Sequence, residues 1–263
     1  MNALPIAALA FYLLSVLLCL HQFVSSKGVS RVHVRAAATI ALVIHFVWLN
    51  KVVFVDAGQN LSVLNTMAII SFMVALLMSI LAERLNGWLL LPIVYLFALT
   101  TIAAVSMSDS VVITHLGDNP ALLLHIILSL FAYSVLLIAC LFSLQLGYLD
   151  WRLKKRKLRP ASIKMPPLMT VERQLFFIIA LGFFLLTLAL FSGMFLLHEK
   201  TSWQMGQELG GSLLAWLCYL LFIWGHHRYG WRARKTMWCN VIGIALLSLA
   251  FFGSHFIQSL VLH

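Results

Sequence analysis

The stretch ALLLHIILSLFAYSVLLIACLFSLQLGYL, residues 121–149, contains no Asp, Glu, Lys or Arg. A helix rises about 1.5 Å per residue, so about 20 apolar residues cross the roughly 30 Å hydrocarbon core of a bilayer. This stretch is therefore predicted to be a transmembrane helix, and stretches of the same kind lie on both sides of it. The eight predicted spans are residues 4–23, 36–54, 61–81, 88–107, 121–149, 175–197, 209–225 and 237–262.

The composition of the whole chain supports this interpretation. Of its 263 residues, 62% are apolar and only 10% are charged, and the mean hydropathy is +0.99. A soluble protein carries about 25% charged residues, so this chain lacks the charge to cover a surface in water. The same figures exclude a disordered chain. We expect an all-α, polytopic membrane helix bundle with eight transmembrane helices, which forms a single integral membrane domain over residues 1–263.

Basic residues are concentrated in alternate connections between the predicted spans. Because cytoplasmic loops of membrane proteins carry an excess of Lys and Arg, these connections are predicted to face the cytoplasm, with both termini on the outer, periplasmic side. The net charge of +10 is thus a topology signal, and it predicts contact with the lipid bilayer and no nucleic-acid partner. No cleavage motif follows residues 4–23, which we expect to be retained as a span. All but two of the 18 Lys and Arg residues lie in segments 24–35, 82–87, 150–174 and 226–236.

The chain lacks the sequence motifs of common enzymes. It contains no glycine-rich phosphate loop, no HExxH and no GxSxG. Its cysteines fall within predicted spans or at their ends and form no CxxC pair, which favours packing over redox chemistry. We therefore expect a non-enzymatic protein. The cysteines are Cys19, Cys140, Cys218 and Cys239.

One face of the predicted helix at 121–149 carries small and polar residues. Their spacing of three or four residues places them on a single helical stripe. In a membrane such a stripe faces other helices, because small residues let backbones approach and hydroxyl groups find partners there. The imidazole of His125 is therefore predicted to project toward the interior of the bundle. The stripe consists of His125, Ser129, Tyr133, Leu136, Cys140, Ser143 and Gly147.

Two interpretations of His125 follow from its chemistry. It either packs between helices through a hydrogen bond or serves as a ligand, because neutral imidazole is a good axial ligand of haem iron. In the last span, either His255 or His263 is placed to meet His125 across the bundle, one on each face of a flat macrocycle. Each of these two histidines also has an interpretation without a ligand role, namely helix packing or a position near the end of the chain. His45 is an intramembrane imidazole and thus a functional candidate, with packing as its other interpretation.

Three motifs lie between residues 124 and 254. The first is LHIILS at 124–129, and the second is GFFLLT at 182–187, which leads to Ser192-Gly193. The third is GWRAR at 230–234, followed by FGS at 252–254. Together these motifs resemble the cytochrome c assembly family that includes CcsA, CcmC and HemX, and most of all its HemX-like branch.

The resemblance implies an eight-helix membrane protein that handles haem. In CcsA-type members, a tryptophan-rich outer segment binds haem between two flanking histidines, which correspond here to His125 and best to His263. The tryptophan-rich motif is reduced to SWQMGQE at 202–208, with a single tryptophan. Trp224 stands where the family has an intramembrane histidine. These departures favour an accessory role over cytochrome c synthesis.

From the residues and the resemblance together, we expect a non-enzymatic haem-handling or haem-binding protein of the bacterial inner membrane. Haem is expected to bind through His125 and a histidine of the last span. Two alternatives stay open. One is an accessory subunit that stabilises another integral membrane protein complex without bound haem. The other is a small-solute transporter, although no predicted span contains the acidic residue that coupled carriers usually need.

Overall fold

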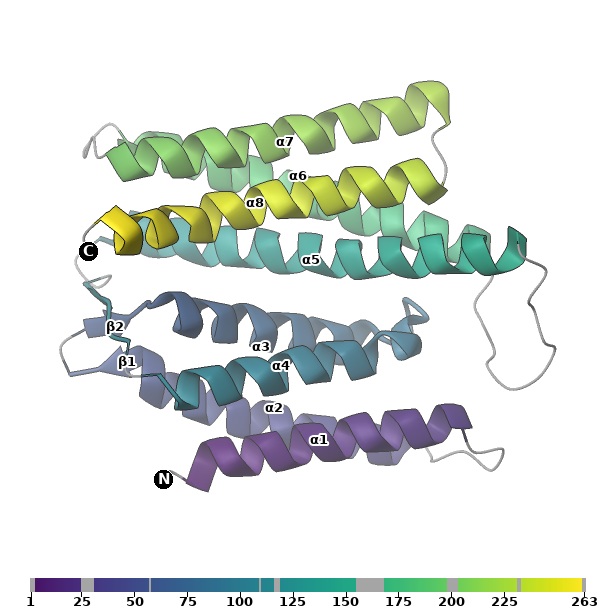
Figure 1. The fold of residues 1–263 in the computed structure, drawn as a ribbon, viewed down its shortest axis with the longest axis horizontal. Helices are drawn as coiled ribbons and strands as arrows, with labels where there is room; N and C mark the ends of the chain where they lie inside the picture. Colours follow the sequence, from purple (N-terminus) through teal and green to yellow (C-terminus); the bar gives the residue numbers. More distant parts are fainter. Residues whose placement is uncertain are drawn as a thin grey trace. The chain divides into compact units, whose positions relative to one another are not determined.

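Long helices dominate the structure (Figure 1). The computed structural model describes residues 3–24, 31–56, 58–108, 110–115, 119–154, 168–197, 203–230 and 233–261. Within these residues, eight helices are long and apolar enough to cross a membrane, which confirms the predicted number of spans. In chain order the elements are α1 (Ala3–Val24), α2 (Arg31–Val53), β1 (Phe54–Val55), β2 (Gly58–Asn60), α3 (Val63–Leu81), the 3-10 turn η1 (Gly87–Leu89), α4 (Leu91–Ser106), β3 (Ile113–Thr114), α5 (Pro120–Lys154), α6 (Leu168–Leu197), α7 (Trp203–Tyr229) and α8 (Ala233–Val261).

Contacts between these elements divide the chain into two compact units. In the first unit, α1 packs against α2 and α4, and α3 packs against the same two helices. In the second unit, α5 packs against α6 and α8, and α7 packs against the same two helices. Each unit is therefore a bundle of four helices. Large, fully buried side chains include Tyr12, Ile70, Met78 and Tyr95 in the first unit and Leu136, Leu175, Tyr219 and Phe222 in the second.

A small antiparallel sheet belongs to the first unit, and apart from Phe54, the last residue of the predicted span 36–54, it lies in segments between the predicted spans. Its strand order is β1-β2-β3, with Phe54 opposite Gln59 and Gln59 opposite Thr114. The side chain of Asn60 joins the two loops, because its Oδ1 accepts a hydrogen bond from the backbone N–H of Val112 at 2.9 Å. Strands of two or three residues are too short to show the alternation of apolar and polar residues that identifies a strand. The sequence pattern therefore does not predict them.

Several helix ends differ from the predicted span ends. The α5 helix continues to Lys154, and α6 and α7 begin earlier than predicted, at Leu168 and Trp203. The predicted ends follow the loss of apolar residues, whereas these helices continue into the polar sequence that flanks each apolar run. The α4 helix is shorter than its predicted span, because Asn86 has a left-handed φ of 48° and a 3-10 turn precedes Leu91.

Five of the seven residues in the stripe on α5 are buried, as the spacing predicted. Gly182 of α6 lies so close that a Cβ there would overlap the side chain of Leu136. Tyr133 donates a hydrogen bond to Ser248 of α8 at 2.8 Å, because Ser248 uses its own proton on the carbonyl of Ile244. Close contacts and hydroxyl groups thus hold α5 against both neighbours. The stripe residues that are at most 9% exposed are Ser129, Tyr133, Leu136, Cys140 and Ser143.

Candidate functional site

His125 lies in the second turn of α5, and its imidazole contacts α6. Its Nδ1 is hydrogen-bonded to Ser192 Oγ at 2.8 Å. The Ser192 hydroxyl itself donates to the backbone carbonyl of Ala189, also at 2.8 Å. With the Ser192 proton on that carbonyl, the Nδ1–H of His125 is the donor and Ser192 the acceptor. In this arrangement His125 is the neutral tautomer whose Nε2 carries a lone pair.

The Nε2 atom of His125 is therefore the nitrogen available for chemistry. No described side chain forms a hydrogen bond with it, and the imidazole is only half-buried. Histidines that bind metals commonly donate one ring N–H to an orienting partner and coordinate through the other nitrogen. The arrangement at His125 has this form, so it can ligate an iron or another transition-metal ion through Nε2.

Gly193 of α6 provides the space that this ring occupies. A Cβ at position 193 would lie 3.0 Å from Cε1 of His125 and 3.6 Å from Nδ1. The absence of a side chain lets the imidazole lie against α6, while the neighbouring Ser192 forms the hydrogen bond. The sequence pattern singled out the pair Ser192-Gly193, but it did not predict this contact, because His125 and Ser192 are separated by 67 positions.

The C-terminal end of α8 lies beside the N-terminal end of α5, since the two helices run antiparallel (Figure 1). The hydrogen bond between Tyr133 and Ser248 sets their register. His125 precedes Tyr133 by about 12 Å along the axis, and His255 follows Ser248 by about 10 Å. The backbone positions of His125 and His255 are therefore at nearly the same level. The side chain of His255 and the whole of His263 lie outside the described residues.

His45 belongs to the first unit and is fully buried there. Its Nδ1 is hydrogen-bonded to the Tyr12 hydroxyl at 3.1 Å. The ring centroids of Trp48 and Phe72 lie 5.8 and 5.4 Å from that of the imidazole. Its Nε2 is buried and has no hydrogen-bond partner in the described part of the chain. These surroundings fit a packing histidine with one unpaired nitrogen, because the imidazole is fully buried among aromatic side chains.

The histidine site on α5 differs from a metal centre built from protein ligands alone. Among the described residues, no group of three or more His, Cys, Asp or Glu side chains is arranged to hold a metal ion. A metal bound at His125 would need most of its donor atoms from elsewhere. A macrocycle supplies four nitrogen donors of its own, so a single oriented imidazole suits a haem iron better than a bare metal ion.

The fold and the site together define a class, that of polytopic membrane proteins with an oriented histidine at the end of a helix bundle. The sequence pattern of the family described as cytochrome C assembly protein matches residues 33–262, and the chain belongs to this family. It is similar to Inner membrane protein YpjD of Escherichia coli strain K12, with 41% identity over 263 residues, which covers 99% of this chain and 100% of that protein. Inner membrane protein YpjD of the E. coli strains O6:H1 and O157:H7 shows the same identity and coverage. No solved structure matches the chain.

These comparisons confirm the resemblance found in the sequence motifs. The chain is a multi-pass protein of the bacterial inner membrane, embedded in the lipid bilayer. Membership in the cytochrome c assembly family indicates a haem-related function in the membrane.

Proposed function

We propose that this protein is a non-enzymatic haem-binding protein and that His125 would hold the haem iron. The observation that carries the proposal is the hydrogen bond between Nδ1 of His125 and Ser192; with Nδ1 as the donor, the Nε2 lone pair is left for a metal. Membership in the cytochrome c assembly family supports haem as the bound group. With the basic loops in the cytoplasm, His125 would lie toward the outer, periplasmic face of the membrane.

The residues around His125 fit a haem group. Its imidazole is neutral and oriented, and Gly193 leaves room for the ring beside α6. Bound haem would supply an iron centre whose reduction potential depends on its axial ligands. In this proposal Ser192 keeps the ligand in one orientation, and His255 or His263 of the last span would supply a second ligand to the iron. The backbone level of His255 relative to His125 supports this pairing.

The absorbance spectrum of the purified protein tests the proposal. Protein purified in mild detergent from haem-supplemented cells should show a Soret band, with nearly equimolar haem in a pyridine haemochrome assay. His125→Ala should lose most of this absorbance, and imidazole added to the buffer should restore part of it by occupying the vacated position. His21→Ala replaces an exposed histidine of α1 and should keep the band. Equal haem content in His125→Ala and His21→Ala would show that His125 is not a haem ligand.

Single substitutions also identify the second ligand. Of His255→Ala and His263→Ala, the variant that lacks the true ligand should change from a low-spin to a high-spin spectrum, while the other keeps the spectrum of the unaltered protein. His45→Ala should leave the spectrum unchanged. If the Soret band is lost in His45→Ala and kept in His125→Ala, haem binds at α2 and the proposal is refuted.

A colourless protein would also refute haem binding, provided that it is folded. Size-exclusion chromatography and circular dichroism establish folding without reference to haem. A folded, colourless protein that copurifies with another integral membrane protein would support the role of an accessory subunit.

A further inference from the structure

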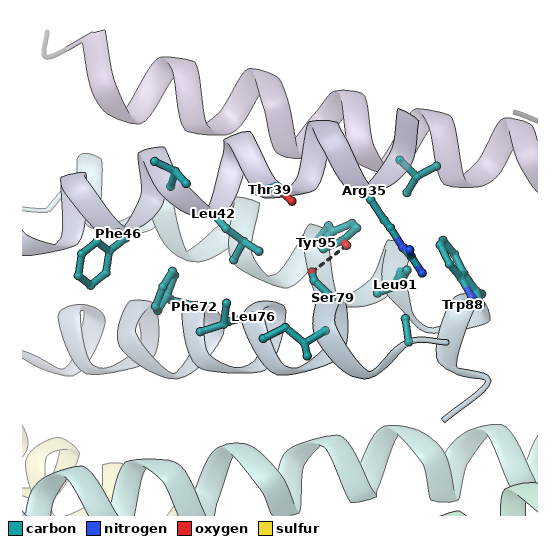
Figure 2. Close-up of a pocket in the computed structure, with 14 residues that line it drawn as sticks. Arg35, Thr39, Leu42, Phe46, Phe72, Leu76, Ser79, Trp88, Leu91 and Tyr95 are labelled. Carbon is teal, nitrogen blue, oxygen red and sulfur yellow. Dashed lines mark hydrogen bonds between the residues drawn. The ribbon is translucent and has the colours of Figure 1, made fainter. Parts of the chain in front are cut away.

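A slot runs between α2 and α3 of the first unit, and side chains of α4 complete its wall (Figure 2). Its volume is about 420 Å³, which lies within the range of ligand-binding sites. The α2 side of the slot extends from Val34 to Phe46, a length of about 18 Å along the helix. Most of the lining side chains are apolar. Val43 and Ile80 at its rim are 58% and 66% exposed, so the slot is open along one side.

One end of the slot is basic (Figure 2). Arg35, which lies at this end near Trp88, forms an ion pair with Glu83. The guanidinium groups of Arg31 and Arg35 lie 5.0 and 5.6 Å from the centre of the Trp88 ring. The hydrogen bond from Arg35 lowers the pKa of the Glu83 carboxyl, so this carboxylate is ionised and balances one guanidinium. The two guanidinium groups and the Glu83 carboxylate together carry a net charge of +1. They lie next to Trp88, and tryptophan is enriched at membrane interfaces.

Hydroxyl groups line the slot between the basic end and the apolar end. Ser79 donates to the carbonyl of Ala75 at 2.6 Å, so Tyr95 must donate its own proton to Ser79 at 2.9 Å. None of the described lining side chains is a His, Cys or Met, and the Tyr95 hydroxyl is already bonded. The slot therefore offers no free ligand for haem iron. Its wall suits a long apolar group that carries a negative charge at one end.

We propose that this slot is a binding site for an anionic phospholipid of the bilayer. One acyl chain lies between α2 and α3, and the phosphate lies at Arg31 and Arg35. The apolar wall matches an acyl chain, and the excess positive charge matches a phosphate, with which guanidinium groups form paired hydrogen bonds. Basic pockets between transmembrane helices bind anionic headgroups in this way. The site involves only the first unit and none of the residues proposed to bind haem.

Native mass spectrometry tests the position of the headgroup. Full-length protein is reconstituted in vesicles with equal amounts of phosphatidylglycerol and phosphatidylethanolamine, and it should retain phosphatidylglycerol preferentially after transfer to detergent. Arg31→Gln should lower the retained phosphatidylglycerol about fivefold, the effect of one charge near an anionic lipid. Lys51→Gln removes an exposed charge at the opposite end of α2 and should change nothing. Equal losses in both variants, or no preference in the unaltered protein, would overturn the proposal.

Filling the slot tests the position of the acyl chain. Leu76→Trp enlarges a lining residue and should reduce phosphatidylglycerol retention to the level of phosphatidylethanolamine. Ile93→Trp, at an exposed position of α4 outside the slot, should keep the preference. If Leu76→Trp does not fold, Val43→Trp at the rim replaces it, with the exposed Val47→Trp as its control on the same helix. A folded slot-filling variant that still prefers phosphatidylglycerol would refute the acyl position.

Discussion

Ser192→Ala should weaken haem binding while leaving His125 in place. The substitution removes the Oγ atom that lies 2.8 Å from Nδ1, so the Nδ1–H loses its acceptor and the ring can turn away from the metal. Loss of the group that orients a ligating histidine typically costs about 10- to 100-fold in metal affinity. We therefore expect the Kd for haem to rise by about tenfold or more, with the same amount of haem bound at saturation.

Haem titrations of the purified protein, followed at the Soret band, measure this change in Kd. Ser143→Ala is the matched control, because it removes a fully buried hydroxyl from α5 that donates to Cys140 of the same helix. The control should leave the Kd unchanged. If Ser192→Ala and Ser143→Ala both bind haem as tightly as the unaltered protein, then Ser192 does not orient an iron ligand and the tautomer argument for His125 is wrong.

Three further predictions concern packing and charge. Gly211→Ala should be less stable than Gly210→Ala by about 1–3 kcal/mol, because a Cβ at 211 would lie 2.7 Å from an alanine Cβ of α8, whereas a Cβ at 210 meets nothing within 4 Å. Thermal unfolding in detergent measures the difference, and equal midpoints would contradict the packing of α7 on α8. His45→Leu should lower the free energy of unfolding by about 1–3 kcal/mol, because a buried tyrosine hydroxyl loses its hydrogen-bond partner; unchanged stability in the same assay would show that this bond is unimportant. Glu83→Gln should lower stability near neutral pH but not in acid, because Arg35 lowers the pKa of Glu83. The ion pair therefore stabilises the fold above the usual carboxyl pKa of about 4.3. This stabilisation is lost as the pH falls through the lowered pKa of Glu83. A difference that persists below that value would rule out the ion pair as its cause.

The number of membrane spans could be predicted because it depends on local sequence alone. The thickness of the bilayer core sets the length of each apolar run, so each run can be counted without knowledge of its neighbours. The buried face of α5 could be predicted for a similar reason. Tyr133, Leu136 and Ser143 share that face through helical periodicity, and all three are at most 6% exposed. His125 belongs to the same stripe, so its inward direction also followed from spacing.

The partner of His125 could not be predicted in this way. Many serine and threonine residues lie in the predicted spans, and the one that meets His125 depends on the register of α6 against α5. That register rests on contacts such as Gly182 against Leu136, which join residues far apart in the chain. The tautomer of His125, and with it the argument for Nε2 as a ligand, therefore came only from the position of Ser192.

The basic slot is likewise a product of tertiary structure. Arg31 and Arg35 begin α2, Glu83 follows α3, and Trp88 lies in the turn before α4. From the sequence alone, the arginines and Glu83 were placed in two separate cytoplasmic segments, 24–35 and 82–87, and Trp88 began the predicted span 88–107. Helices that are apolar on every side show no polar face from which their neighbours can be inferred. Local sequence thus determined which segments cross the membrane and which histidines are candidate ligands. Tertiary structure decided which histidine is oriented and where the basic groups meet, because hydrogen bonds and ion pairs require atoms within about 3–4 Å of each other, a distance that only the packed helices specify.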